Sequence, residues 1–501
     1  MADNKFGWAS VKTNFRSRSQ ARARSTLGVV QQDIGQPVNV YRSKELAKLD
    51  AYYDSTQYDH LPPWDQAKDA NDQHLSVRKR KPRLNHPFAK TLAQRLTAKL
   101  IGLSVFPSFI VEDQPDDTEF FKAILRESNL RTAIVEPTRV MLNGGSCFLR
   151  FWLSYGVMKT EWYSAKFTYP TFQPNGELES VDIKYVFEDP AEKDENGNSK
   201  KKWFKITLGM NEEILFDNPD FKTNVEPVFE EVERVQHDLG FVQGEWMRVG
   251  DTSGENESID GYGLTSDLMD FIDELNYSLS QSSQAVSYNQ DPQLVLNGIS
   301  EEETDSLIRS VMKSWNLGMK GTAQFLESNL DGVKVAMDLR DKVRLNIQEI
   351  TRVLLLDPEK IVGSAQSAKA MEVLYGPLKD LVDELRPIME KLLKHVLQKM
   401  ALMILVAAKK GIDTPLMLPP GYVPQSLDLT VDWPPIFQQT MEDLQKKVQV
   451  ASSAKTTGLI APKTAIRYIA KDFGIEDIDA EIAEIDAAAA AAAALNPFGG
   501  F

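Results

Sequence analysis

The sequence predicts an α+β fold in which a β-rich region lies between helical segments. Apolar residues recur at intervals of three and four before residue 104 and again after residue 266, which is typical of helices that bury one face. Aromatic and β-branched residues dominate residues 146–249 instead, and Asn175-Gly176 and Asn196-Gly197-Asn198 are typical hairpin turns. We therefore expect an antiparallel region inside a mainly helical chain.

The composition is that of a globular protein with an uneven charge. Of the 501 residues, 42% are hydrophobic and 26% charged, which excludes a wholly disordered chain. The formal net charge is -15, from 57 Lys/Arg and 72 Asp/Glu, which argues against a generally cationic nucleic-acid binder. Residues 1–100 carry 18 Lys/Arg and 9 Asp/Glu, a net of +9, so the remaining chain carries -24. The first fifth is thus suited to an anionic partner that the rest would repel.

Cysteine usage and hydropathy limit the setting of the protein. Cys147 is the single cysteine and cannot form an intrachain disulfide, which fits a reducing compartment. The longest strongly apolar stretch, residues 400–408, is far shorter than the ~20 residues of a bilayer-spanning helix, so we expect no transmembrane segment. The Arg-rich residues 12–24 resemble a transit peptide in composition, and a flexible basic arm explains them as well.

Two helices are expected before the β region, over residues 44–53 and 88–103. Between them the basic cluster 78–83 either binds phosphate or forms a solvated loop that faces an acidic neighbour. Gly144-Gly145-Ser146-Cys147 lacks the spacing of a nucleophile elbow, so we expect a close backbone approach there.

An acidic segment follows the β region, because residues 249–308 contain thirteen Asp/Glu and no Lys or Arg. Ser266 is expected to cap a long helix here. The apolar stripe of this helix is Leu268, Phe271, Ile272, Leu275 and Leu279. The acidic residues off the stripe are Asp267, Asp270, Asp273 and Glu274. Their place near the helix N-terminus also suits the helix dipole.

A small β-α-β module and a second long helix come next. Strands are expected over 292–298 and 322–326, and Ser300 with Glu303 forms a capping box for a helix between them. The second long helix has the apolar stripe Val335, Leu339, Val343, Ile347, Ile350 and Leu354. It is interpreted as cationic, with Lys334, Arg340, Lys342 and Arg344 off this stripe. It is expected to end at Asp357-Pro358.

The C-terminal part continues with helices. A polar loop leads to a helical run over 367–410, where Pro377 and Pro387 predict kinks or a break at Pro377. A strand is expected over 427–431 and a helix over 441–455 that stops at Gly458. A helix from Pro462 and an acidic helix that Ala487–Ala494 extends complete the chain.

No catalytic or metal-binding pattern is present in the sequence. It contains no phosphate-binding Gly-x-x-x-x-Gly-Lys-Ser/Thr motif, and its five histidines lack a metal-ligand spacing. We therefore expect no enzyme, no cofactor and no metal site.

The order of these parts resembles the portal protein, or head-tail connector, of tailed bacteriophages. The matching residues are Gly263-Leu264-Thr265-Ser266-Asp267-Leu268, Asp270 to Asn276, Pro292 to Gly298, Ser367-Ala368-Lys369-Ala370, Tyr375 to Leu378, and Gly458 to Ala465. The family often has Ser-Gly where this chain has Ser364-Ala365 or Ser367-Ala368.

The resemblance implies a portal-like architecture with a mixed α/β wing, a two-helix stem, a small β-α-β clip, a long kinked helix and a helical crown. The implied boundaries are a flexible basic arm at 1–40, wing at 41–255, first stem helix at 256–290, clip at 291–328, second stem helix at 329–356, channel loop at 357–366, kinked tunnel helix at 367–411, wing return strand at 412–435, and crown with tail at 436–501. The channel-loop residues are Glu359, Lys360, Val362, Gly363, Ser364 and Gln366.

The resemblance also implies a function at one vertex of a virus capsid. Such proteins form rings of twelve copies, assembled in the host cytoplasm, through which double-stranded DNA is packaged and ejected. The implied partners are the terminase motor, the major capsid or scaffold protein and head-tail adaptors, with no membrane. The acidic and cationic stem helices of adjacent copies could pair around the ring.

An alternative from another class is an acidic oligomeric enzyme or regulator whose basic N-terminal arm binds nucleic acid. Salt-dependent duplex binding by a monomer would support it. A ring that forms without nucleic acid would support the portal.

Overall fold

The computed structural model describes most of the chain between residues 39 and 487. The described residues are 39–66, 68, 73–111, 114–193, 197–222, 227–250, 259–290, 293–297, 322–326, 331–353, 375–419, 421–422, 429–436, 441–470, 473, 481–485 and 487. The chain divides into two compact units, one of residues 1–361 with 374–434 and one of residues 362–373 with 435–501. The basic arm before residue 39, the channel-loop residues Glu359 to Gln366 and the helix expected after Ser300 lie outside the described residues.

The first unit begins with helices that pack against one another. These elements are α2 (Asn39–Asp54), the short η3 (Val77–Lys79), α3 (Phe88–Leu100), α4 (Pro115–Glu127), α5 (Leu130–Ala133) and α6 (Val135–Gly144). The helices predicted near 44–53 and 88–103 are confirmed as α2 and α3. Leu92, Leu96 and Leu100 of α3 are fully buried at the expected helical spacing.

Two antiparallel sheets follow and share one apolar core cluster. The strands are β2 (Ser146–Ser154), β3 (Val157–Ser164), β4 (Thr168–Phe172), β5 (Leu178–Lys193), β6 (Ser199–Gly209), β7 (Glu212–Phe216), β8 (Glu231–Gln236) and β9 (Gly244–Arg248), with η4 (Ala165–Phe167) between β3 and β4. One sheet has the order β3-β2-β9 and the other β4-β5-β6-β7-β8. Gly176 and Gly197 have positive φ in the predicted turns, so both hairpins are confirmed. Phe148, Ile183 and Ile206 belong to the apolar core that the two sheets share.

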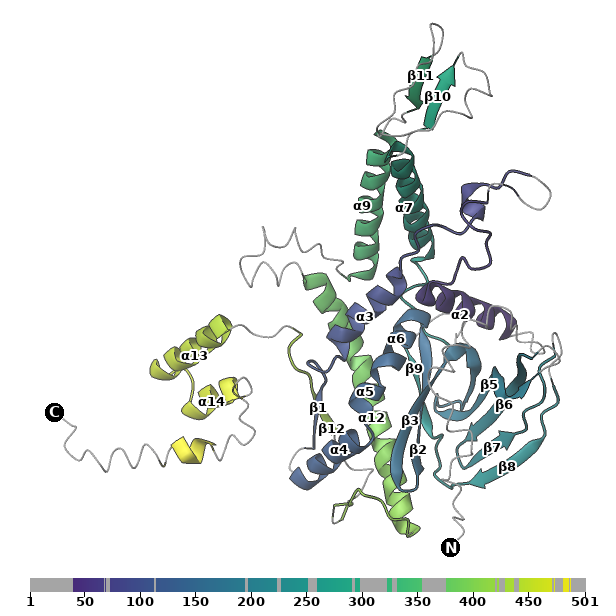
Figure 1. Cartoon of the computed structure of the whole chain (residues 1–501). Coiled ribbons are helices and arrows are strands. Elements are labelled where there is room, and N and C mark those ends of the chain that lie inside the picture. Colours follow the sequence, from purple (N-terminus) through teal and green to yellow (C-terminus); the bar gives the residue numbers. More distant parts are fainter. Residues whose placement is uncertain are drawn as a thin grey trace. The chain divides into compact units, whose positions relative to one another are not determined.

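A helical hairpin projects from this unit (Figure 1). It consists of α7 (Met269–Gln290) and α9 (Asp331–Thr351), joined by the antiparallel ribbon of β10 (Gln293–Asn297) and β11 (Thr322–Leu326). Both predicted strands of the inserted module are thus confirmed. The rest of the unit, residues 39–250 and 375–434, is called the body.

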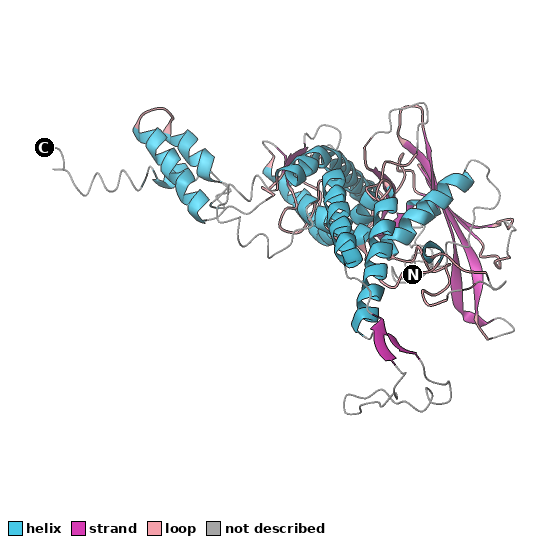
Figure 2. Cartoon of the chain, turned by 90° about the horizontal axis from the view of Figure 1, so that it is seen from above, coloured by secondary structure: helices cyan, strands magenta, loops and turns pink. Residues whose placement is uncertain are grey.

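A long helix and a two-stranded sheet complete the body. α12 (Gly376–Lys409) begins at Gly376, with Pro377 in its first turn, and it continues through Pro387. The strand predicted at 427–431 is β12 (Leu429–Asp432), which pairs with β1 (Ser108–Val111). Figure 2 shows most strands on one side of this unit and its long helices on the other.

The second unit contains α13 (Met441–Thr456) and α14 (Pro462–Ala470). Gly458 has φ +72°, and its N–H bonds to the carbonyl of Lys455 at 3.1 Å, which closes α13 as predicted. Pro462 begins α14, also as predicted. Within the described part of this unit the buried apolar residues are Ala451, Ala465 and Ala470 together with Ile436 and Ile482.

Two predicted helix boundaries are wrong. α7 begins at Met269, so Ser266 is not its cap, because the N–H groups of Ser266 and Leu268 bond to the carbonyls of Gly263 and Thr265 in consecutive turns. The second long helix ends at Thr351 rather than at Asp357-Pro358.

Arg352 has φ +54°, which ends the helix. The Thr351 hydroxyl accepts a hydrogen bond from the N–H of Val353 at 3.2 Å and so replaces the next helical bond.

Candidate functional site

The junction between the α7–α9 hairpin and the body is built on a crossing of backbones. The N–H of Val249 bonds to the carbonyl of Gly145 at 2.9 Å, and the N–H of Leu264 bonds to that of Leu142 at 2.8 Å. A Cβ on Gly145, whose φ is +90°, would lie 1.9 Å from the Gly261 oxygen, and one on Gly263 would lie 2.1 Å from the Asn143 oxygen. Only glycine fits these positions. The predicted close backbone approach at Gly144-Gly145 is therefore confirmed.

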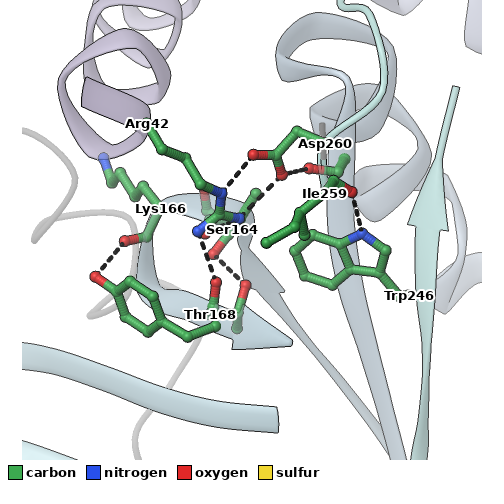
Figure 3. A network of polar contacts seen from close by, with 10 residues as sticks. Arg42, Ser164, Lys166, Thr168, Trp246, Ile259 and Asp260 are labelled. Carbon is green, nitrogen blue, oxygen red and sulfur yellow. Dashed lines mark hydrogen bonds and ion pairs between the residues drawn. The ribbon is translucent and has the colours of Figure 1, made fainter. Parts of the chain in front are cut away.

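A largely buried ion pair fixes the same segment to α2 (Figure 3). The Arg42 guanidinium forms two hydrogen bonds with the Asp260 carboxylate and donates to the carbonyls of Ala165 and Thr168 at 3.0 Å each. The hydroxyl of Ser146 also donates to Asp260. The indole N–H of Trp246 donates to the carbonyl of Ile259 at 3.0 Å, a typical length for an N–H···O hydrogen bond. Charge and hydrogen bonds thus hold the chain immediately before α7.

A third set of contacts covers one side of α7. Tyr52 and Tyr58 donate from their hydroxyls to the two oxygens of Asp273, at 2.8 and 2.5 Å. Burial, reinforced by the hydrogen bond to Asp273, raises the pKa of both tyrosines well above its usual value. Asp273 is therefore engaged inside its own chain and is not a free surface carboxylate.

The described residues of 55–86 (55–66, 68 and 73–86) continue this contact along α7, and we call them the strap. The amide of Asn276 accepts from the N–H of His86 at 3.0 Å, and the hydroxyl of Ser280 accepts from the N–H of Leu84 at 2.9 Å. Tyr277 donates to backbone carbonyls of the strap and packs with Tyr58 and Trp64 in a small buried cluster. The strap thus binds α7 through side chains on three successive turns.

The basic cluster of the strap faces an acidic neighbour, which was one of the two predictions for it. Arg78 pairs with Glu274 at 2.5 Å, and Lys81 pairs with Asp59 at 2.7 Å. The hydrogen bond to Glu274 raises the pKa of Arg78. Sequence reasoning missed the wider signal that residues 73–111 contain eight Lys/Arg and no Asp or Glu.

The remaining predicted acidic residues lie on the surface. Asp267 precedes α7 and accepts a hydrogen bond from the Tyr262 hydroxyl, which raises the pKa of Tyr262 to about 12. Asp270 is exposed in the first turn of α7. The four predicted acidic residues therefore divide into two that the body binds and two that remain near solvent.

α9 differs from the prediction in its charge. Its four predicted cations are balanced by Asp331, Asp338, Asp341 and Glu349, so its formal net charge is zero. Arg340 pairs with its neighbour Asp341 at 2.7 Å, Lys334 and Lys342 are exposed, and Arg344 is half-buried. The basic counterpart of the acidic α7 is thus the strap rather than α9.

The predicted apolar stripe of α9 is only partly buried. Val343 and Ile347 are buried, whereas Val335 is 66%, Leu339 44% and Ile350 46% exposed. The three exposed positions fall within a sector of roughly 60° of the helix, since each residue turns by about 100°. α9 therefore carries an uncovered apolar row.

No metal cluster or activated thiol is present among the described residues. They include no group of three or more side chains able to hold a metal ion, and none of their helices is long and apolar enough to cross a membrane. Cys147 is fully buried, and burial raises the pKa of its thiol, so it is not an activated nucleophile.

Comparison with known families decides the identity of this architecture. Residues 40–494 match the family described as phage portal protein, SPP1 Gp6-like. The chain belongs to this portal protein family. Portal proteins of this kind are non-enzymatic components of the virion that form the capsid-vertex connector for DNA packaging and ejection. The enzyme-or-regulator alternative is therefore not retained.

Two further comparisons accompany the family match. No curated protein matches the chain. Among solved structures, the portal chain is similar to one described as the neck of a native GTA particle computed with C12 symmetry, at 9% identity and a TM-score of 0.41. The match covers 90% of this chain and 99% of that one.

Proposed function

We propose that this portal protein works as a ring of twelve copies, with the α7–α9 hairpin as its stem and double-stranded DNA passing through the centre. In this proposal the body is the wing, the β10–β11 ribbon belongs to the clip, α12 is the tunnel helix and the second unit is the crown. The observation that supports it best is that each helix of the hairpin has a row of side chains that its own chain leaves exposed.

The two uncovered rows differ from each other. On α9 the row is Val335, Leu339 and Ile350, and on α7 it is Asp270, Gln281 and Tyr288, beyond the side that the strap covers. A contact between unlike surfaces of neighbouring copies is heterologous, and it closes into a ring when the rotation allows. Exposed apolar side chains in a row are also typical of a surface that a partner buries.

The size and charge of such a ring suit a DNA conduit. Twelve helices about 10 Å apart trace a circle about 38 Å across. Roughly 27 Å remains free after one helix diameter is removed, which admits a duplex. Twelve chains of -15 give a formal charge of -180. Acidic walls repel phosphate and hold DNA weakly, because few cations neutralise it.

The mass of the purified protein tests the ring. Twelve copies of 56.4 kDa give about 677 kDa, and negative-stain images should show a central hole. A monomer or dimer in the absence of other phage proteins would contradict spontaneous ring formation.

Two matched variants test which surface makes the contact. Val335→Asp places a charge on an exposed position and should leave the helical content unchanged while the ring dissociates. Val343→Asp places it on a buried position and should disrupt the hairpin itself. Light scattering with circular dichroism separates the two results. A ring of normal mass from Val335→Asp would remove the α9 row from the interface.

We further propose that residues 357–366 form the channel loop. Their polar sequence between α9 and α12 supports this assignment. Charge reversal at Glu359, or deletion of Gly363 and Ser364, should impair DNA packaging while the ring stays intact. Normal packaging by both variants would contradict the assignment.

The ring also requires partners in this proposal. Because the sequence has no phosphate-binding motif, the force for packaging comes from a separate terminase ATPase that docks on the ring. The major capsid or scaffold protein and head-tail adaptors are the other proposed partners. Packaging assays with purified ring, terminase and ATP test this requirement, since the ring alone should translocate no DNA.

A further inference from the structure

The strap carries two cations that its own chain does not pair. Lys79 and Arg83 are exposed, and among the described residues neither side chain meets a carboxylate. Their neighbours Arg78 and Lys81 each form an ion pair within the chain. Leu84, which follows in the strap, is also exposed. The strap therefore presents a surface that combines positive charge with an apolar side chain.

α9 presents a surface of the opposite charge. Asp338 and Glu349 are exposed, and neither contacts a cation in the part of the chain that the structure describes. Both lie about 40–60° around the helix from Val335 of the uncovered apolar row, since each residue turns by about 100°. Lys342 is exposed on the same side, one turn after Asp338. This side of α9 thus combines an apolar row with two unpaired carboxylates.

The strap and α9 lie on opposite sides of α7 (Figure 1). The strap bonds to Asn276 and Ser280 on one side, and α9 packs along α7 as the other arm of the hairpin. In the proposed ring the order α9, α7, strap therefore repeats from copy to copy. A contact between unlike surfaces of neighbouring copies then brings the strap of one copy to α9 of the next.

The heights of the two surfaces along the hairpin also agree. Ser280 accepts a hydrogen bond from the strap residue that follows Arg83, and it lies ten residues before the end of α7. Asp338 lies seven residues after the start of α9. The two helices form one hairpin and have the same rise per residue, so these positions differ by about 4.5 Å in height.

The second pair of charges agrees in the same way. Lys79 is level with Tyr277, because the Tyr277 hydroxyl donates to the carbonyls of the residues on both sides of Lys79. Tyr277 lies thirteen residues before the end of α7, and Glu349 lies eighteen after the start of α9, a difference of about 7.5 Å. Rotation about the ring axis leaves these heights unchanged. A lysine on its flexible four-carbon stem can cover such an offset.

We propose that the strap of each copy binds α9 of the next copy, with Arg83 paired to Asp338, Lys79 paired to Glu349, and Leu84 against the apolar row. We call this the strap–α9 contact. Complementary charges of this kind fix the register of an interface and suppress wrong partners. The inference rests on the proposed ring and names the residues that join its copies.

A second copy suits the strap better than nucleic acid does. The strap also exposes the carboxylates of Asp59 and Asp65. Carboxylates repel phosphate, and DNA binding depends on how many phosphates cations neutralise. Two unpaired cations beside two carboxylates fit a protein surface of mixed charge instead.

Reversal of the charges tests the contact. A strap variant carries Lys79→Glu with Arg83→Glu, and an α9 variant carries Asp338→Lys with Glu349→Lys. Each places like charges together, so the protein concentration at which half of the chains are in rings should rise at least about tenfold. Light scattering at one fixed ionic strength measures this concentration. Circular dichroism should show unchanged helical content, because none of the four side chains forms an ion pair in its own described chain.

Mixing the two variants makes the test specific. In an alternating ring of equal amounts, every contact joins opposite charges again, so the mixture should form rings at the wild-type concentration. Lys222→Glu with Lys409→Glu makes the same change of charge at exposed positions elsewhere on the body and should leave the ring unaffected.

The contrary results separate this inference from the ring itself. Normal rings from both variants, beside normal wild-type rings, would overturn the strap–α9 contact and leave the ring proposal intact. A mixture that forms no rings would overturn the pairing of these two surfaces. An intact ring of the strap variant that loses affinity for a DNA duplex would make phosphate the occupant and overturn the contact. A wild-type chain that forms no ring would overturn the ring proposal and the contact together.

Discussion

The two helices of the projecting hairpin are fastened to the body in different ways. α7 is fixed by the glycine crossing, by the Arg42–Asp260 pair and by the strap, which bonds to side chains over three turns. α9 ends just before Arg352, and both side chains of the ion pair between Arg352 and Glu384 are exposed. The comparison teaches that α7 sets the direction of the hairpin. The place of α9 depends on α7 and α12 and, in the proposed ring, also on neighbouring copies.

The largest expected effect comes from the crossing. Gly145→Ala forces a Cβ against the Gly261 oxygen in a backbone that disfavours any side chain, so we expect a loss of more than about 4 kcal/mol in unfolding free energy. Gly176→Ala is the matched control, because its φ is also positive but nothing lies near its Cβ. Urea unfolding of both variants measures the difference. Equal losses of unfolding free energy would show that the positive φ, and not the close approach of the two backbones, makes glycine necessary at Gly145.

Next in size is the ion pair before α7. Asp260→Asn leaves the Arg42 charge enclosed without its partner, which should cost about 3–5 kcal/mol. Glu384→Gln removes the exposed pair at the end of α9 and should leave stability unchanged within error. The same unfolding assay compares the two. Similar losses of unfolding free energy in the two variants would contradict the conclusion that α7 is attached to the body more firmly than α9.

The contact between the end of α12 and His237 should make the stability of the protein depend on pH. The Lys410 side chain after α12 donates to the carbonyl of His237 at 3.1 Å, and burial lowers the pKa of His237 to about 4 from 6.5. The folded protein therefore disfavours the protonated form. The neutral, buried His237 therefore contributes about 2–3 kcal/mol to the free energy of unfolding above pH 6.5, relative to acid pH. This contribution is lost as the pH falls from 6.5 to 4. His237→Gln should flatten stability against pH in that window, and an unchanged slope would reject the assignment.

The smallest expected effect comes from loss of the hydrogen bond between the Tyr58 hydroxyl and Asp273 of α7. Tyr58→Phe removes a buried donor to Asp273 and should cost about 1–2 kcal/mol. Tyr262→Phe removes an exposed donor to Asp267 and should cost less than about 0.5 kcal/mol. A double-mutant cycle with Asp273→Asn isolates the bond to Tyr58. A coupling energy near zero would show that packing alone holds Tyr58.

The confirmed sequence predictions are those that depend on local signals. The turns at Gly176 and Gly197, the stop at Gly458 and the helix start at Pro462 depend on the residue itself and its nearest neighbours. Ser266 has the same kind of signal, yet the bond between Leu264 and Leu142 holds the chain there in turns. β8 was not predicted, because half of its residues are charged and its side chains are mostly exposed.

The junction could not be predicted, since its contacts join distant parts of the chain. Arg42 and Asp260 are separated by 218 residues, and nothing near either one identifies the other. The exposed row on α9 was missed for a related reason. The spacing of Val335, Leu339, Val343 and Ile347 shows one apolar stripe but not how far a single neighbouring helix covers it.

The pairing of β1 with β12 has a consequence for biosynthesis. Ser108 lies opposite Asp432, so β1 leaves the ribosome 324 residues before its partner strand. At about 5–20 residues per second, that interval is about 16–65 s. During it the apolar side chains of Phe109 and Val111, buried in the finished protein, await their cover. Translation of the C-terminal third therefore sets when the nascent body can close, and chaperones have that long to act on it.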